Sequence, residues 1–310
     1  MPVARIAALL LSLFSFAPAH AASSQRTFVA STGVDTSAAF NCSLVAPCRS
    51  FAAAISVTSP KGEVIVLDSA AYGVIPAITK SIYVTAPPGI YAGITVFSGD
   101  GITINAGIND TVVLRGLTIN GQGGANGITI TNALVVHVEN CVIANMSIGI
   151  NQVKGLLEVK DTIVRNNSNI GVAAIVTTAA DARVTVSRSL ISSNNYGIYV
   201  SAAPDIIALA IAAISDSAIS GNGVGVHVDG NILGPYVTGQ VVLTRDTVTS
   251  NAAGLEILAA GAAVIDGNNL WGNTTFDITG DPIAEIASAN NNHAQNISSS
   301  LAAIKILPNH

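Results

Sequence analysis

Charged residues are scarce in this chain of 310 residues: Asp, Glu, Lys and Arg together make up 10%, whereas 50% of the residues are hydrophobic. The 13 Lys and Arg are outnumbered by 18 Asp and Glu, and they form no basic cluster. Nucleic acids and anionic membrane surfaces are bound through concentrated positive charge. We therefore expect no nucleic acid partner.

Long hydrophobic runs are also missing beyond the N-terminus, where none approaches the roughly 18 residues of a membrane-spanning helix. The first 21 residues contain one basic residue, Arg5, then an apolar run over 6–16 and the small-residue sequence Ala19-His20-Ala21. This order is typical of a secretory signal peptide. We predict cleavage after Ala21, no membrane span in the remaining chain, and a secreted or periplasmic location.

Cysteine is rare, with three residues in the chain. Export implies an oxidising compartment, so Cys42 and Cys48 are predicted to form a disulfide that closes a short loop. Cys141 lies in an apolar strand pattern and is expected to act as a small buried hydrophobe. The spacing of the three does not suggest a metal site.

What the sequence does contain is a repeated phrase that begins with Gly-Ile or a close variant and ends on Asn. Its copies are 22 to 29 residues apart and begin at Gly101, Gly127, Gly149, Gly171, Gly197, Gly225 and Gly254. A repeat of this length indicates a solenoid whose units must stack to bury their apolar faces. Because consecutive copies run in one direction, equivalent strands pair in parallel. The prediction is an all-β parallel β-helix.

Less regular segments flank the repeats. Residues 22–61 are predicted to hold a first strand, the disulfide loop and a short helix near 51–55 that caps the first coil. The parallel β-helix is expected over 62–280, and 281–310 would form a terminal cap or tail.

Aligning the second strand of each copy on an inward apolar residue places further residues in columns. The aligned residues are Leu114, Val138, Val159, Val186, Ile214, Leu243 and Ile265. Eight positions after the last five, a structural ladder of stacked side-chain amides is predicted at Asn167, Asn194, Asn222, Asn251 and Asn273. Two positions after the anchor, charges of alternating sign follow one another, which favours exposed structural ion pairs over a catalytic cluster.

The signal peptide, the loop from Cys42 to Cys48 with the following Arg-Ser-Phe-Ala-Ala-Ala-Ile, and the Gly-Ile/Asn repeats resemble the right-handed parallel β-helix proteins of the pectin lyase-like superfamily. The resemblance covers residues 26 to about 280 and implies a single-stranded right-handed β-helix. The catalytic signatures of polygalacturonases, the calcium-binding carboxylates of pectate lyases and the alginate epimerase pattern are absent. No catalytic residue is carried over, no cofactor is expected, and Ca²⁺ is left open.

One outward column contains the candidate ligand-binding residues. It runs through Thr103, Thr129, Asn151, Ala173, Tyr199, His227, Glu256 and Thr279. Tyr199, His227 and Glu256 lie on consecutive coils, and Asp229 lies on the same face. Insertions around 202–210 and 229–240, the second with Tyr236, would wall this face.

These residues support three hypotheses. We favour a monomeric, non-catalytic protein that binds polysaccharide or another cell-surface polymer along this face. The alternative is a polysaccharide-modifying enzyme in which His227 is the base and Glu256 or Asp229 its partner. The third possibility is a structural or protein-interaction rod.

Overall fold

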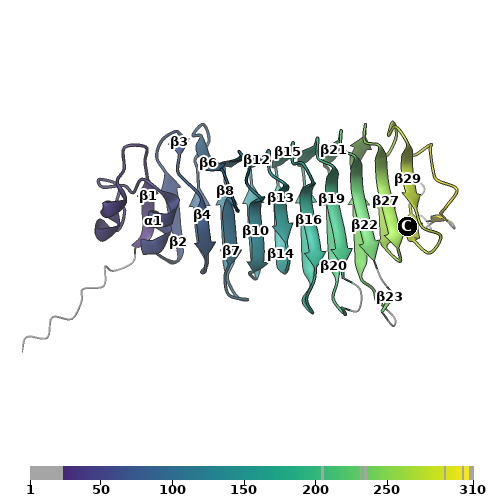
Figure 1. Cartoon of the computed structure of the whole chain (residues 1–310), viewed down its shortest axis with the longest axis horizontal. Helices are drawn as coiled ribbons and strands as arrows, with labels where there is room; N and C mark the ends of the chain where they lie inside the picture. Colours follow the sequence, from purple (N-terminus) through teal and green to yellow (C-terminus); the bar gives the residue numbers. More distant parts are fainter. Residues whose placement is uncertain are drawn as a thin grey trace, which may run out of the picture.

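The chain folds into an elongated parallel β-helix in which successive coils stack along one axis (Figure 1). The computed structural model describes residues 24–203, 206–230, 232–233, 236–289, 291–301 and 304–306. The predicted signal peptide lies outside these residues. The all-β parallel β-helix expected from the repeats is confirmed.

Each regular coil contributes one strand to each of three parallel sheets. The nine-stranded sheet, ordered from its C-terminal end, contains β29 (Phe276–Gly280), β27 (Ala253–Ala259), β22 (Val224–Gly230), β19 (Tyr196–Ala202), β16 (Ile170–Val176), β13 (Ile148–Gln152), β10 (Asn126–Asn132), β7 (Ile102–Asn105) and β4 (Ile75–Ile78). The eight-stranded sheet contains β26 (Thr247–Thr249), β21 (Ala218–Ser220), β18 (Leu190–Ser192), β15 (Ile163–Arg165), β12 (Val142–Ala144), β9 (Leu117–Gly121), β6 (Ala92–Val96) and β3 (Ala70–Ala71).

The twelve-stranded sheet extends furthest toward both ends. It contains β1 (Ser24–Val29), β2 (Thr58–Val66), β5 (Ile82–Thr85), β8 (Thr111–Arg115), β11 (Val135–Glu139), β14 (Gly155–Lys160), β17 (Ala182–Ser187), β20 (Ala210–Ser215), β25 (Gly239–Thr244), β28 (Ala262–Asp266), β30 (Glu285–Ser288) and β31 (Ile304–Ile306). An antiparallel hairpin of β23 (Ile232–Leu233) and β24 (Tyr236–Val237) projects from the second insertion. Among the described residues, no helix is long and apolar enough to cross a membrane.

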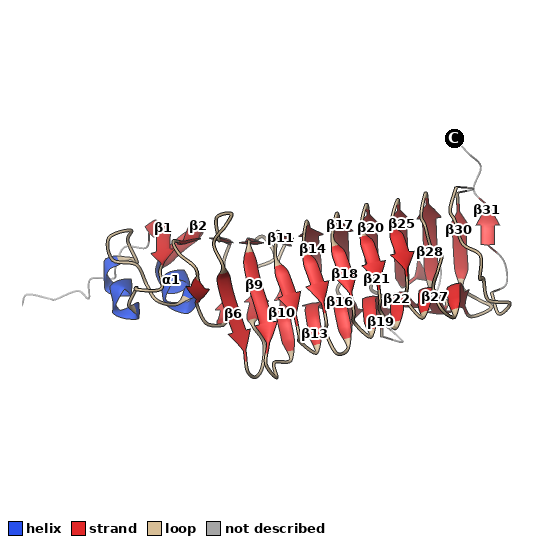
Figure 2. Ribbon diagram, turned by 90° about the horizontal axis from the view of Figure 1, so that it is seen from above, coloured by secondary structure: helices blue, strands red, loops and turns tan. Residues whose placement is uncertain are grey.

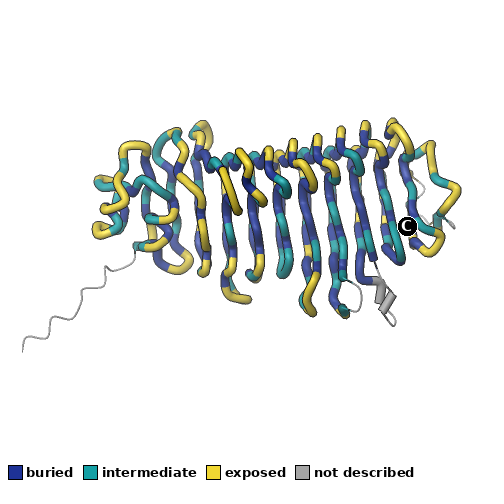
Figure 3. Tube along the Cα trace, viewed as in Figure 1, coloured by how far each residue is buried: buried dark blue, intermediate teal, exposed yellow. Residues whose placement is uncertain are grey.

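The core follows from the alternation of β-branched and other apolar residues, because every second side chain of a strand points inward. The predicted anchor column is in register throughout, from Leu114 and Val138 to Leu243 and Ile265. Its members are fully or almost fully buried. Figure 3 shows the same division along the rod, with buried positions within the strands and exposed ones at many of the turns.

The N-terminal end is closed by the helix α1 (Phe51–Val57), the 3₁₀ helix η1 (Asp35–Phe40) and the disulfide loop (Figure 2). Cys42 and Cys48 are disulfide-bonded, as predicted. The backbone of this loop bonds to the free edge of β1: Phe28 N donates to Cys42 O at 2.8 Å, and Cys48 N donates to Phe28 O at 2.9 Å. The loop thus satisfies an edge that would otherwise be open to pairing.

At the corner between the eight-stranded and nine-stranded sheets, the column of asparagines forms a continuous hydrogen-bonded ladder. Asn167 N donates to Asn194 Oδ1 at 3.0 Å, and Asn194 N donates to Asn222 Oδ1 at 2.9 Å. The same bond is repeated from Asn222 to Asn251 and from Asn251 to Asn273. The side-chain Nδ2 groups donate along the column as well, at 2.9 to 3.0 Å. All five side chains are buried.

A second ladder, which the sequence analysis did not identify, lies at the corner between the twelve-stranded and eight-stranded sheets. Here each backbone N–H again donates to a side-chain oxygen of the next coil, through Thr162, Ser189, Ser217, Asp246, Asn268 and Asn292. Asp246 is the one ionisable rung. Its burial raises the pKa of the carboxyl to about 6, although bonds from the backbone of Ser217 and Thr244 oppose this shift.

The alternating charges lie outside this corner, on residues with a left-handed backbone conformation. Arg188 Nε lies 2.8 Å from Asp161 Oδ1, and Arg245 Nε lies 2.8 Å from Asp216 Oδ1. Arg115 and Glu139 on the adjoining column are 2.7 Å apart. These exposed pairs join neighbouring coils, which is the structural role expected from their alternating sign.

We predict that Asn222→Ala will lower the unfolding free energy on the order of 3 kcal/mol. The substitution leaves the buried N–H groups of Asn194 without their acceptor, and it removes the donor to Ile191 O. Urea unfolding measures this loss. The exposed neighbour Asn195 provides the control, since Asn195→Ala should change stability by less than about 0.5 kcal/mol. Equal stability of the two variants would contradict the ladder's role.

We also predict that Asp246 makes stability depend on pH. Its carboxyl has a pKa of about 6 when folded, against about 3.9 in an unfolded chain. The cost of burying the charge is therefore complete above about pH 6, and it is relieved as pH falls toward 4. When the pH is lowered from 7 to 4.5, the unfolding free energy of the wild type should rise on the order of 2 kcal/mol relative to that of Asp246→Ser, as measured by urea unfolding. Parallel stability curves would refute this prediction.

Candidate functional site

The predicted outward column lies in the register expected from the sequence. On the nine-stranded sheet Thr103 pairs with Thr129, and the pairing continues through Asn151 and Ala173 to Tyr199. Tyr199 then pairs with His227, His227 with Glu256, and Glu256 with Thr279. The strands β19, β22 and β27 therefore present three chemically distinct side chains at adjacent positions.

Aromatic rings pack against one another on these strands. The rings of Tyr199 and His227 are stacked, with centroids 4.5 Å apart and an interplanar angle of 16°. The ring of Tyr196 makes a T-shaped contact with each of them, with centroids 5.2 Å apart in both cases. We call Tyr196, Tyr199, His227 and Glu256 the aromatic patch. Both tyrosines are half-buried, so part of each ring faces solvent.

His227 differs from the exposed side chain that the outward column implies, because it is 4% exposed. The two tyrosines lie against it, and Glu256 Oε2 is 2.8 Å from Nδ1. This contact fixes the orientation of the ring. An imidazole so covered has little surface on which to meet a substrate, whereas Tyr196, Tyr199 and Glu256 remain partly accessible.

Asp229 adds a second carboxylate to the same face, where it pairs with Ser201 and Leu258. The pKa of Tyr199 is raised, first because the phenol is partly buried and then because the charge of Asp229 opposes its ionisation. Tyr199 therefore keeps its hydroxyl proton at neutral pH and can donate a hydrogen bond. Glu256 and Asp229 give the face two acceptors for hydroxyl groups.

The two insertions emerge from the ends of β19 and β22. A hollow of about 200 Å³ lies beside them, lined by Asp181, Ile207, Ala208, Leu209 and Thr238. Leu209 N donates to Asp181 Oδ1 at 2.9 Å, which holds the first insertion against the preceding coil. The side chain of Tyr236, predicted to line the wall, is outside the part of the chain whose side chains are described.

Sequence reasoning missed Tyr196, which pairs with Ile170 and Val224 two positions before the inward isoleucine column. In the described ranges, no group of three or more His, Cys, Asp and Glu side chains is placed to hold a metal ion. Cys141 is buried, and burial raises its pKa to about 11, so the thiol stays protonated and unreactive.

No protein-family model and no curated protein matches the sequence. Solved structures do resemble it. The pectate lyase Pel9A aligns with a TM-score of 0.57 at 15% identity, over 89% of this chain and 79% of that one. XylC in complex with xylose aligns with a TM-score of 0.57 at 10% identity, over 86% and 70%.

A third similar structure is tailspike protein 2 of Escherichia coli O157:H7 bacteriophage CAB120, with a TM-score of 0.54 at 14% identity. That alignment covers 83% of this chain but spans 38% of the tailspike. The resemblance to β-helix proteins inferred from the sequence is thus confirmed at the level of the fold.

We predict that Tyr199 and His227 are energetically coupled. A double-mutant cycle of Tyr199→Ala and His227→Ala, measured by urea unfolding, should give a coupling energy of about 1 kcal/mol because each substitution alone removes the ring stack. As a control, Tyr199→Ala and His137→Ala should be additive within about 0.5 kcal/mol, since His137 lies on the twelve-stranded sheet. Additivity in both cycles would contradict the packing of the patch.

Proposed function

We propose that this chain is a secreted polysaccharide-binding protein whose aromatic patch binds the polymer without cleaving it. The observation that carries the proposal is the combination of two partly exposed tyrosine rings with Glu256 and Asp229 on one outward face. A tyrosine ring offers an apolar surface to the face of a sugar and a polar tip to its hydroxyls. Carboxylates accept hydrogen bonds from those hydroxyls.

The charge of this face favours a neutral polymer. Glu256 and Asp229 would repel a polyanion at neutral pH. His227 does not offset this repulsion for a ligand, because it is buried and already bonded to Glu256. The first insertion, held against the preceding coil through Leu209 and Asp181, adds a wall beside the strands of the patch. An extended polymer would lie across several coils, as suits a flat parallel sheet.

Two further observations support the proposal. The fold is shared with a pectate lyase and with XylC, which was solved with xylose. The disulfide between Cys42 and Cys48 suits an oxidising compartment, which supports secretion of the chain. Burial of His227 argues against the enzymatic alternative, because a general base must reach the proton that it removes.

The proposal predicts retardation of the protein in gels that contain a neutral polysaccharide from a panel of xylan, β-glucan and galactomannan. Tyr199→Ala should raise the dissociation constant at least about tenfold because it removes the partly exposed ring that stacks on His227, a loss of about 1.4 kcal/mol. The exposed Tyr91 is the matched control, and Tyr91→Ala should bind as the wild type does. Equal binding by both variants would refute the assignment of the patch.

A reducing-end assay on the same mixtures tests the absence of cleavage. We expect no release of reducing ends. Release that disappears in the double variant His227→Ala, Glu256→Ala would instead establish the enzymatic alternative.

A further inference from the structure

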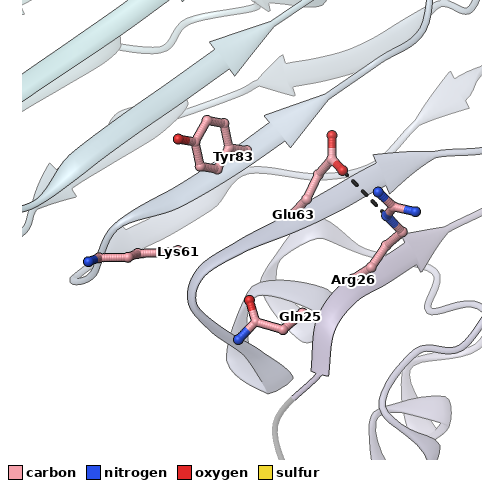
Figure 4. Close-up of a pocket in the computed structure, with 5 residues that line it drawn as sticks. All are labelled: Gln25, Arg26, Lys61, Glu63 and Tyr83. Atoms are coloured by element: carbon pink, nitrogen blue, oxygen red, sulfur yellow. Dashed lines mark ion pairs between the residues drawn. The ribbon is translucent and has the colours of Figure 1, made fainter.

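A hollow of about 590 Å³ lies on the outer face of the twelve-stranded sheet, near the N-terminal end of the rod. It is lined by Gln25, Arg26, Lys61, Glu63 and Tyr83 (Figure 4). This site is on a different sheet from the aromatic patch and at the other end of the molecule. The sequence analysis did not single out any of its side chains as functional.

Three of the lining residues form a row across consecutive strands. Arg26 on β1 pairs with Glu63 on β2, and Glu63 pairs with Tyr83 on β5. Neighbouring strands are about 4.8 Å apart, so the row extends over about 10 Å. Figure 4 shows these three side chains in a row across the strands, with Lys61 and Gln25 beside the row. The hollow therefore presents a guanidinium, a carboxylate and an aromatic ring in sequence.

Arg26 is held less closely than the other paired arginines. Its Nε is 3.5 Å from Glu63 Oε2, and its side chain is 64% exposed. By contrast, the other arginine ion pairs in the described residues measure 2.7 to 3.0 Å, and Arg188 and Arg245 each bind a carboxylate through two nitrogens. The guanidinium of Arg26 is thus open to a further carboxylate, which it can bind through two parallel hydrogen bonds.

The groups around Arg26 offer an aromatic ring, a second positive charge and polar atoms to a ligand in the hollow. Tyr83 is 41% exposed, and its ring provides an apolar surface. Lys61 adds a second positive charge, partly offset by Asp110, whose oxygens already accept bonds from Ser81 and Gly107. Glu63 and Gln25 supply polar groups that can bond to hydroxyls. The charges of Arg26 and Lys61 are balanced by Glu63 and Asp110, so the preference for a carboxylate rests on the exposed, loosely paired guanidinium of Arg26.

We propose that this hollow binds a sugar residue that carries a carboxylate. The carboxylate lies on the Arg26 guanidinium, the hydroxyls bond to Glu63 and Gln25, and one face of the ring packs on Tyr83. The site is independent of the aromatic patch, where Glu256 and the neighbouring Asp229 favour a neutral polymer. The protein therefore has two sugar sites with opposite charge preferences on separate faces.

Saturation-transfer NMR titrations of the purified chain with glucuronate, galacturonate, glucose and acetate test this proposal. We expect at least one of the two uronates to bind at least about tenfold more tightly than glucose or acetate. Arg26→Gln should reduce this affinity about tenfold or more. Arg26→Lys should give an intermediate loss, because lysine keeps the positive charge but lacks the planar guanidinium that forms two parallel hydrogen bonds. Arg183→Gln, on the same sheet, should have no effect.

Tyr83→Phe and Tyr83→Ala separate ring packing from loss of the hydroxyl, and we expect only the alanine variant to bind several-fold more weakly. Circular dichroism confirms the fold of each variant. Equal binding of glucose, acetate and both uronates, or uronate binding unchanged in Arg26→Gln, would overturn the proposal. Tyr199→Ala should leave uronate binding intact, and Arg26→Gln should leave binding of neutral polysaccharide intact. Failure at one site is therefore distinguishable from failure at the other.

Discussion

From Cys141 onward, the structure depends on the bonds that successive coils make to a side-chain oxygen of the next coil at two corners. One ladder runs through Asn167 to Asn273, and the other from Thr162 through Asp246 to Asn292. The alternation of inward and outward residues opposes a slip by one residue, but a slip by two keeps the apolar side chains inward. A buried backbone N–H with its acceptor on one particular side chain opposes both slips, because a shifted register leaves it unsatisfied. The ladders therefore fix the alignment of the coils.

Because of this alignment, coils of different length keep their strands in the same register. The coils that carry Tyr199 and His227 contain the insertions, yet their strands remain paired residue for residue with each other and with β27. Extra residues are accommodated between sheets, where they lie beside the face of the patch. On the first coils, which precede the ladders, parallel strand pairing sets Arg26, Glu63 and Tyr83 side by side on the twelve-stranded sheet. The rigid stack thus holds two sets of polar and aromatic side chains on different faces.

Much of this could be predicted from the sequence because a parallel β-helix repeats the same alignment in every coil. The position of each residue relative to the repeated Gly-Ile predicts three columns: the outward column from Thr103 to Thr279, the inward anchors and the asparagines. The ladder of Thr162, Ser189 and Ser217 lay three residues after the anchors but was hidden by its mixed residue types. Burial of His227 depends on how the Tyr196 and Tyr199 rings turn across strands, which periodicity does not determine.

The central functional claim is that this rod binds a polysaccharide and leaves it intact. Size-exclusion chromatography with light scattering, applied to protein and polymer incubated together with and without Ca²⁺, measures both properties at once. The account predicts that the protein elutes with the polymer and that the molar mass of the polymer stays constant over time. A falling polymer mass would show that the protein is an enzyme, and separate elution from every polymer would contradict the binding function.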